Sequence, residues 1–141
     1  MDEIRYYMEE NLLSVGPDDT AAKAARFMLG HKVGSLLVKS GEDEYIGIVT
    51  EGDLSRKIIA QSRDPEKTRV REVMSQPIRS IESSRLTPTA LIQMNKNHIR
   101  HLAVTDGGKI VGLLSINDFI AYYANLYSRN KQAEGPSALG G

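Results

Sequence analysis

The stretch Gly-Ile-Val-Thr-Glu-Gly-Asp at residues 47–53 recurs as Gly-Leu-Leu-Ser-Ile-Asn-Asp at residues 112–118. Each copy reads glycine, two aliphatic residues, a hydroxyl residue, two variable positions and an aspartate. An aliphatic run that ends in a hydroxyl residue predicts a buried strand that leads into a helix. Because the pattern occurs twice, the sequence around the first copy is compared with the sequence around the second to find out whether the repeat is longer.

The two stretches belong to a longer internal repeat, which is the first feature to look for in a sequence. Equivalent residues follow one another in the same order and at a constant offset, which falls by one residue in the turn before Gly47. A length change is tolerated best in a turn, so the shift supports a duplication rather than chance similarity. The pairs include Ser14 and Ser80, Ala24 and Ala90, Met28 and Met94, Leu36 and Leu102, Val38 and Val104, and Met8 and Met74.

Each copy predicts the order strand, helix, strand, strand, helix. The expected strands are 12–15, 36–38 and 46–50 in the first copy, and 78–81, 102–104 and 110–115 in the second. Helical spacing of apolar residues follows Thr20 and Thr87, and Asp106-Gly107-Gly108 is typical of a hairpin turn. The fold class is therefore α/β (α+β), built from two βαββα units. We expect the first repeat at 1–61, a charged linker at 62–71, the second repeat at 72–127, and a polar, Gly-rich, poorly ordered tail at 128–141.

Composition excludes several kinds of protein. The 141 residues contain 18 Lys and Arg, 18 Asp and Glu, and no cysteine. Balanced charge argues against a nucleic-acid partner, and the lack of cysteine excludes disulfides and thiol catalysis. No apolar run approaches the ~20 residues of a membrane-spanning helix. The acidic start Met1-Asp2-Glu3 is unlike a signal peptide, so we expect a cytoplasmic protein without membrane contact.

The repeated motif has two interpretations. Thr50 and Ser115 can act as helix N-caps, with Asp53 and Asp118 completing a capping box. Alternatively, the hydroxyl residue and the aspartate bind a polar ligand, because free N–H groups at a helix start favour phosphate and a carboxylate accepts hydrogen bonds from sugar hydroxyls. Recurrence at matched positions of a duplication favours the second interpretation.

The sequence resembles the CBS-domain family, specifically a stand-alone two-copy CBS pair (a Bateman module). The resemblance runs over about residues 4–126 and rests on the stretches 18–22, 33–38, 47–53, 73–74, 99–104 and 112–118. It implies a pseudo-two-fold disc with two clefts between the copies. It also implies binding of AMP, ADP, ATP, NAD or S-adenosylmethionine, and frequent pairing of two modules through their helices.

Carried over by position, the resemblance assigns roles to both copies. Asp53 and Asp118 would hold ribose hydroxyls, and Thr50 and Ser115 would lie at the ribose–phosphate end. The remaining assignments are adenine-lining contacts from Asn11, Leu12, Pro77 and Ile78, and phosphate contacts from Gly34, Ser35, Arg100 and His101.

Two departures from the family pattern predict unequal clefts. Gly52 stands where many relatives carry a bulky basic residue, and Gly34-Ser35 offers no charge where the other copy has Arg100-His101. Phosphate should therefore favour the cleft of Asp53.

A binding module is preferred over an enzyme. No nucleophile–base set, phosphate loop or metal-ligand spacing is visible, so we expect no catalytic residue, no metal and no required cofactor. The alternatives are a ligand-free dimerisation or docking scaffold and, more remotely, a small nucleotide hydrolase. We expect a homodimer through the helices that carry Leu54, Ile58, Phe119 and Tyr123, and a downstream protein partner of unknown identity.

Overall fold

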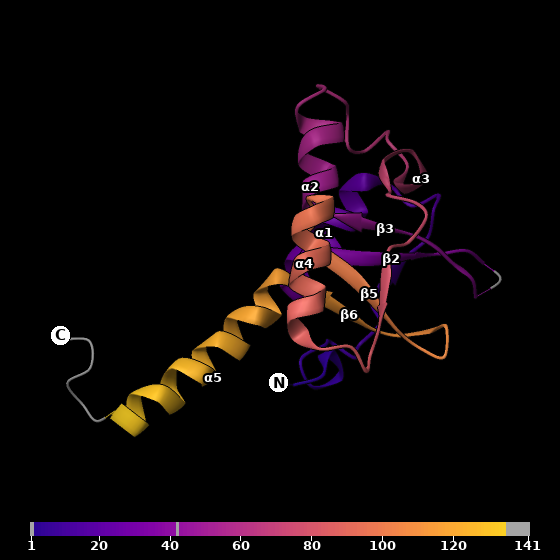
Figure 1. Ribbon diagram of the computed structural model, residues 1–141. Helices are drawn as coiled ribbons and strands as arrows, with labels where there is room; N and C mark the ends of the chain where they lie inside the picture. The colour runs from indigo at the N-terminus through magenta and orange to yellow at the C-terminus, as the bar shows by residue number, and fades with distance from the viewer. Residues whose placement is uncertain (1, 42, 135–141) are drawn as a thin grey trace.

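The computed structural model describes residues 2–41 and 43–134 and has the predicted α/β order (Figure 1). The first half contains the short 3-10 helix η1 (Ile4–Tyr6), β1 (Ser14–Val15), α1 (Ala21–His31), β2 (Ser35–Lys39), β3 (Tyr45–Thr50), α2 (Glu51–Leu54) and the π-helix η2 (Ser55–Ile59). The second half contains α3 (Val70–Val73), β4 (Ser80–Glu82), α4 (Thr87–Asn97), β5 (His101–Asp106), β6 (Lys109–Ser115) and α5 (Ile116–Glu134). The βαββα order is confirmed in both copies.

Each copy forms its own three-stranded sheet, in the orders β1-β2-β3 and β4-β5-β6. The first two strands of each sheet run parallel, and the last two form an antiparallel hairpin. Gly107 and Gly108 close the second hairpin with positive φ, as the Asp-Gly-Gly sequence predicts. The first strand of each copy begins two residues later than predicted, at Ser14 and Ser80.

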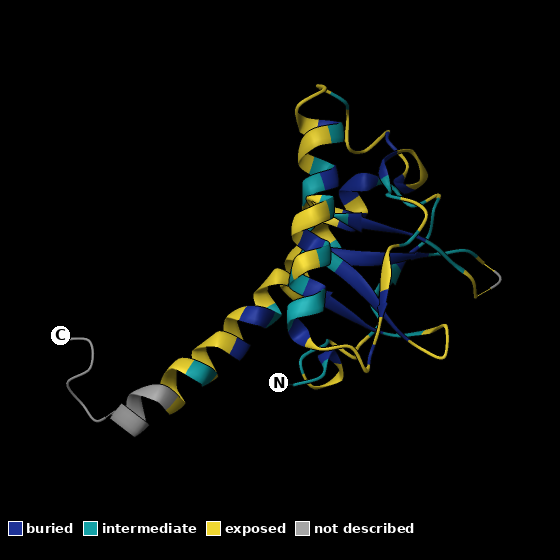
Figure 2. Ribbon diagram, viewed as in Figure 1, coloured by how far each residue is buried: buried dark blue, intermediate teal, exposed yellow. Residues whose placement is uncertain are grey.

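The strands β2, β3, β5 and β6 are largely buried on both faces, because each sheet has a helix layer on one side and the other sheet on the opposite side. Alternate residues of β2 show this: Leu36 and Val38 belong to the core beneath α1, whereas Leu37 belongs to a separate cluster. That cluster joins Leu37 and Ile48 of the first copy to Ala103 and Leu113 of the second. Figure 2 shows the central strands mostly in the colour of buried residues.

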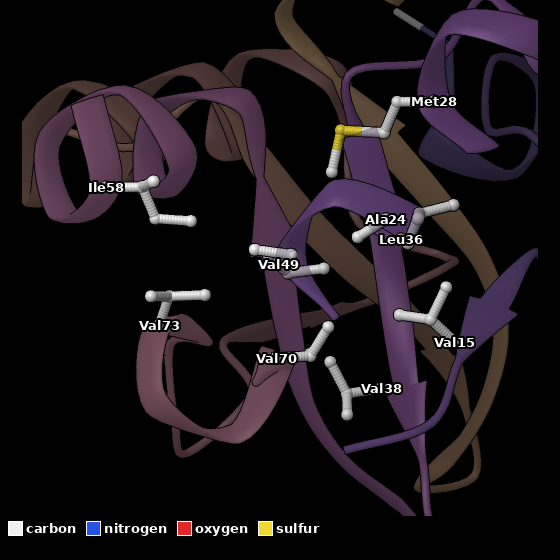
Figure 3. Close-up of a cluster of buried hydrophobic side chains, with 10 residues drawn as sticks. Val15, Ala24, Met28, Leu36, Val38, Val49, Ile58, Val70 and Val73 are labelled. Atoms are coloured by element: carbon white, nitrogen blue, oxygen red, sulfur yellow. The ribbon is translucent and has the colours of Figure 1, made fainter. Parts of the chain in front are cut away.

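The two copies exchange their opening segments. Ile4, from η1, is fully buried in the core of the second copy, beside Phe119. Val70 and Val73, from α3, are fully buried in the core of the first copy, where Figure 3 shows them next to Val49 and Val38. The predicted repeats at 1–61 and 72–127 therefore do not coincide with the two hydrophobic cores. The opening segment of each repeat packs in the core of the other copy.

The segment predicted as a linker, 62–71, is docked rather than free. Thr68 and Val70 are buried, and the Ala21 N–H donates to the Thr68 carbonyl at 2.8 Å. The Val70 N–H donates to the Asp19 carbonyl at 2.9 Å, which is a second backbone hydrogen bond between this segment and the first copy. The predicted linker is therefore packed against the first copy in its second half, where Val70 is part of the first core.

The predicted tail is partly helical. Helix α5 continues without a break to Glu134, and in Figure 1 it extends away from the sheets. The expectation of a poorly ordered tail from 128 is wrong up to this point, because residues 128–134 contain no glycine or proline and include good helix formers. The rest of the predicted tail, 135–141, lies outside the described residues.

Two of the four residues that mark the helices expected to form the dimer are core residues. Ile58 and Phe119 are each 3% exposed. The apolar side chains that face outward on the same helices are Ile59, Ile116, Ile120, Tyr123 and Tyr127. Over the part of the chain that the structure describes, no helix has the length and apolar character needed to cross a membrane.

Candidate functional site

A cleft of about 810 Å³ lies between the two copies. The first copy contributes the end of β3 and the helical turn after it, including Thr50 and Asp53. The second copy contributes the segment before β4 and the segment that enters β5. The full lining is Ile48, Thr50, Glu51, Gly52, Asp53, Ser55, Arg56, Lys57, Met74, Ser75, Gln76, Pro77, Arg79, His98, Ile99, Arg100 and His101.

Asp53 is the polar centre of the inner wall of this cleft, and it is 1% exposed. The N–H and hydroxyl of Thr50 donate to its Oδ2 atom at 3.0 and 3.1 Å, and the Asp53 N–H donates back to the Thr50 hydroxyl at 3.1 Å. These bonds form a capping box, so the first interpretation of the motif is confirmed for Thr50 and Asp53.

The second carboxylate oxygen of Asp53 reaches across the cleft floor. The Ser75 hydroxyl donates to Oδ1 at 3.0 Å, and Lys57 Nζ lies 3.0 Å from the same atom. Ser75 belongs to the segment that opens the second copy, so one buried carboxylate ties the two copies together. With Thr50, these groups supply all the hydrogen-bond donors that two carboxylate oxygens readily accept.

The cleft carries excess positive charge. Three arginine side chains and one lysine line it against two carboxylates, and the lysine, Lys57, is paired with Asp53. Among the described residues, the guanidinium groups of Arg56, Arg79 and Arg100 make no ion pair or hydrogen bond, whereas four arginines elsewhere pair with carboxylates. Those paired with carboxylates are Arg5, Arg26, Arg63 and Arg71. Unpaired guanidinium groups that share a cleft are suited to bind a phosphate or carboxylate.

His101 lies at the entry to β5, opposite the acidic residues of the first copy. Burial lowers its pKa from the usual 6.5, and the carboxylates of Glu51 and Asp53 partly oppose the effect, while Arg100 reinforces it. The imidazole is therefore predominantly neutral at pH 7. A bound anion would favour its protonated form.

Residues 2–60 and 70–125 match the family model described as CBS domain. The chain belongs to the CBS domain family. It is 37% identical, over 107 residues, to a mitochondrial CBS domain-containing protein from Arabidopsis thaliana; the match covers 73% of this chain and 52% of the relative. The chain spans about half the length of the curated relatives it matches.

Solved structures show the same CBS-pair fold. A protein with CBS domains from Burkholderia ambifaria superposes with a TM-score of 0.77 at 38% identity, covering 81% of this chain and 83% of that one. A CBS domain protein from Pyrobaculum aerophilum complexed with AMP superposes with a TM-score of 0.73, covering 83% of this chain and 89% of that one. The second is 22% identical, so the likeness concerns the fold alone.

The second CBS repeat repeats the motif with different surroundings. The Ser115 N–H donates to Asp118 Oδ2 at 2.7 Å, and the Ser115 hydroxyl lies 3.4 Å from the same atom. Glu9 occupies the position equivalent to Ser75, as their matched bridges to Leu113 and Ile48 show. Burial raises the pKa of Asp118, the Ser115 hydrogen bonds oppose the rise, and the charge of Glu9 adds to it.

The basic residues of the cleft beside Asp53 have no basic counterparts at the positions that would surround Asp118. The repeat offset matches Arg56 with Ala121, Lys57 with Tyr122, Arg79 with Leu13, and Arg100 with Gly34. The difference in charge between the surroundings of Asp53 and those of Asp118 is therefore larger than the Gly34-Ser35 comparison alone predicts.

Five of the twelve candidate residues line the cleft: Thr50, Asp53, Pro77, Arg100 and His101. The others lie outside its lining. Gly34 and Ser35 lie beside the start of β2, Ser115 and Asp118 at the junction of β6 and α5, Asn11 is exposed, and Leu12 and Ile78 pack between the sheets.

Sequence reasoning missed Ser75, Lys57, Arg56 and Arg79. A signal existed for Lys57, because a lysine four residues after Asp53 can pair with it on a helix. No sequence pattern indicated Ser75, whose approach depends on the packing of the two repeats.

Proposed function

We propose that the chain is a non-enzymatic regulatory module that binds an adenosine nucleotide, AMP, ADP or ATP, in the cleft between its CBS repeats. The observation that carries the proposal is the meeting of Asp53 and Thr50, from the first repeat, with the unpaired Arg79 and Arg100 of the second. A ligand with a sugar and a phosphate satisfies both sides at once. The AMP bound to the Pyrobaculum aerophilum relative supports this ligand class.

The two ends of the ligand would contact different walls. A ribose hydroxyl binds the Asp53 carboxylate by replacing the Ser75 hydroxyl, which is an O–H donor of the same kind at 3.0 Å. The phosphate lies toward Arg79 and Arg100, where guanidinium groups can donate paired hydrogen bonds. Ile48, Met74 and Pro77 offer apolar surface for the base. Neither a catalytic group nor a cofactor is needed for this binding.

NAD and S-adenosylmethionine share the adenosine group and remain candidate ligands. The positive charge of the cleft favours NAD, which has two phosphates, over S-adenosylmethionine, whose sulfonium is a cation.

Isothermal titration calorimetry of the full chain with AMP, ADP, ATP, NAD and S-adenosylmethionine tests the proposal. We expect saturable binding of the phosphate-bearing ligands. Binding of none of the five would contradict it and leave the ligand-free docking scaffold. Turnover of a bound nucleotide, followed by chromatography of the products, would instead support a nucleotide hydrolase.

Self-association is the second part of the proposal. Ile116, Ile120, Tyr123 and Tyr127 recur on one face of α5 at helical spacing and are between 36% and 65% exposed. An exposed apolar stripe of this length favours a partner surface, and a second copy of the chain provides a matching one. We therefore propose a homodimer that forms through α5.

A further inference from the structure

Gly52 and Arg56 share one space on the wall of the cleft. A Cβ atom built on Gly52 would lie 2.8 Å from Arg56 Nη1, 3.0 Å from Nη2 and 3.2 Å from Cζ. The guanidinium group therefore occupies the space that a side chain at residue 52 would take, one helical turn before its own Cα. This position is open to Arg56 only because residue 52 has no side chain.

No internal partner explains why the Arg56 guanidinium lies there. Within the described residues, its nitrogens make no hydrogen bond or ion pair, and both Gly52 and Arg56 line the cleft. The carboxylate four residues before Lys57 belongs to that lysine, at 3.0 Å, and so does not hold Arg56. A guanidinium group without a carboxylate, on a cleft wall, has its donors available for a ligand.

The fold does not require this pair. The second repeat has Asn117 and Ala121 at the matched positions and forms the same strand-to-helix junction, with Asp118 bonded to the Ser115 N–H. The Gly52–Arg56 pair occurs only beside the basic cleft. Ligand binding therefore explains the pair better than a structural role at the start of the helix does.

We propose that Arg56, seated over Gly52, is a phosphate-binding residue of the cleft and determines its preference for phosphate-bearing adenosine ligands over adenosine and S-adenosylmethionine. The inference rests on the proposed function and deepens it. Arg56 then contacts the phosphate from the first repeat, while Arg79 and Arg100 approach from the second. Contacts from both repeats explain how one anion can hold the two repeats together.

Two substitutions test the shared space. Arg56→Ala removes the guanidinium group, and Gly52→Ala displaces it by adding a methyl group where the nearest atoms are the tip of a flexible side chain. Gly30→Ala is the matched control, because it also lies in a helix and an added Cβ meets nothing within 4 Å. Arg85→Ala controls for loss of an exposed arginine away from the cleft.

The variants and the double variant are titrated with AMP and with adenosine by calorimetry. We expect Arg56→Ala to weaken AMP binding about tenfold or more, as loss of a charge-assisted hydrogen bond does, and to leave adenosine binding within about twofold. Gly52→Ala should weaken AMP similarly, and the double variant should be no weaker than Arg56→Ala alone. Both controls should match the wild type.

Equal losses for AMP and adenosine, or additive losses in the double variant, would overturn the assignment of Arg56. Inorganic pyrophosphate, followed by thermal shift, separates this failure from that of the proposed function. If the wild type binds pyrophosphate but no nucleotide, and Arg56→Ala abolishes the binding, the anion site stands and the adenosine assignment falls. If the wild type binds neither, both proposals are wrong.

Discussion

Replacing Asp53 with alanine should destabilise the protein far more than the same change at Asp118, although the two residues hold equivalent positions. The Asp53 carboxylate receives bonds from the Thr50 N–H at 3.0 Å, the Thr50 hydroxyl at 3.1 Å and the Ser75 hydroxyl at 3.0 Å. It also pairs with Lys57 at 3.0 Å and is 1% exposed. Its removal leaves several buried donors without an acceptor.

The magnitude follows from these contacts. Loss of an N-cap interaction costs about 1 kcal/mol, and loss of a buried hydrogen bond to a charged group costs about 1.5–3 kcal/mol. The Lys57 side chain is 36% exposed and its ammonium group can be solvated instead, so loss of the ion pair adds little to the loss of folding free energy. We expect about 3 kcal/mol in total for Asp53→Ala, a fall of roughly 6–12 °C in Tm for a domain of this size.

Asp118→Ala is the matched control. Asp118 keeps the cap bond from the Ser115 N–H at 2.7 Å, but Glu9 replaces the serine and Tyr122 replaces the lysine. Its carboxylate is also disfavoured by burial, which raises its pKa. We expect a loss of about 1 kcal/mol or less.

Urea unfolding at pH 7, followed by circular dichroism, measures both losses. Ser75→Ala should reproduce part of the Asp53→Ala loss. Equal destabilisation by Asp53→Ala and Asp118→Ala would refute the reasoning, because the contacts that distinguish the two positions would then contribute nothing. An intact Asp53→Ala protein that binds AMP as tightly as the wild type would refute the ribose contact.

Three further results are expected. Arg100→Ala should weaken AMP and ATP about tenfold or more but leave adenosine unchanged, in calorimetric titrations; equal losses would make it a packing residue. Because burial lowers the pKa of His101 below 6.5, the unfolded chain binds a proton that the folded chain does not, so stability should fall as pH drops below 6.5. His101→Asn should flatten that fall in urea titrations at successive pH values. Ile120→Glu, at a position 65% exposed, should convert a dimer to monomer in light scattering, and a monomeric wild type would contradict the α5 interface.

The fold could be predicted because the duplication gives two different sequences for each helix and strand, and both sequences predict the same element. Alternating and continuous apolar runs located the strands within two residues, and Gly107-Gly108 located a hairpin by its need for positive φ. The docking of 62–71 could not be predicted. Its charged residues are typical of a linker, and only tertiary packing turns Thr68 and Val70 inward.

The candidate site was predictable where local pattern and chemistry agree. Thr50 and Asp53 carry a spacing with a known capping geometry. The resemblance to CBS pairs placed Arg100 and His101 at the cleft of Asp53, and both residues line it. Ser75 has no local signal, because its hydroxyl meets Asp53 only after the repeats have packed. Arg56 was hidden for a different reason, since its position depends on an absent side chain at Gly52.

The exchanged opening segments bear on the history of the chain as well as its packing. A polypeptide with a single repeat would expose Ile4 and Met8 and lack the covering that Val70 and Val73 provide, so its core would be completed only by another molecule. Fusion of two such units replaces an encounter at cellular concentration with one at the high effective concentration of a tether. Before fusion, a single repeat had to pair with an identical copy of itself. After fusion, the two halves can differ in sequence, because each pairs only with the other half. The basic residues beside Asp53 and the acidic Glu9 beside Asp118 are a difference of the kind that such divergence allows.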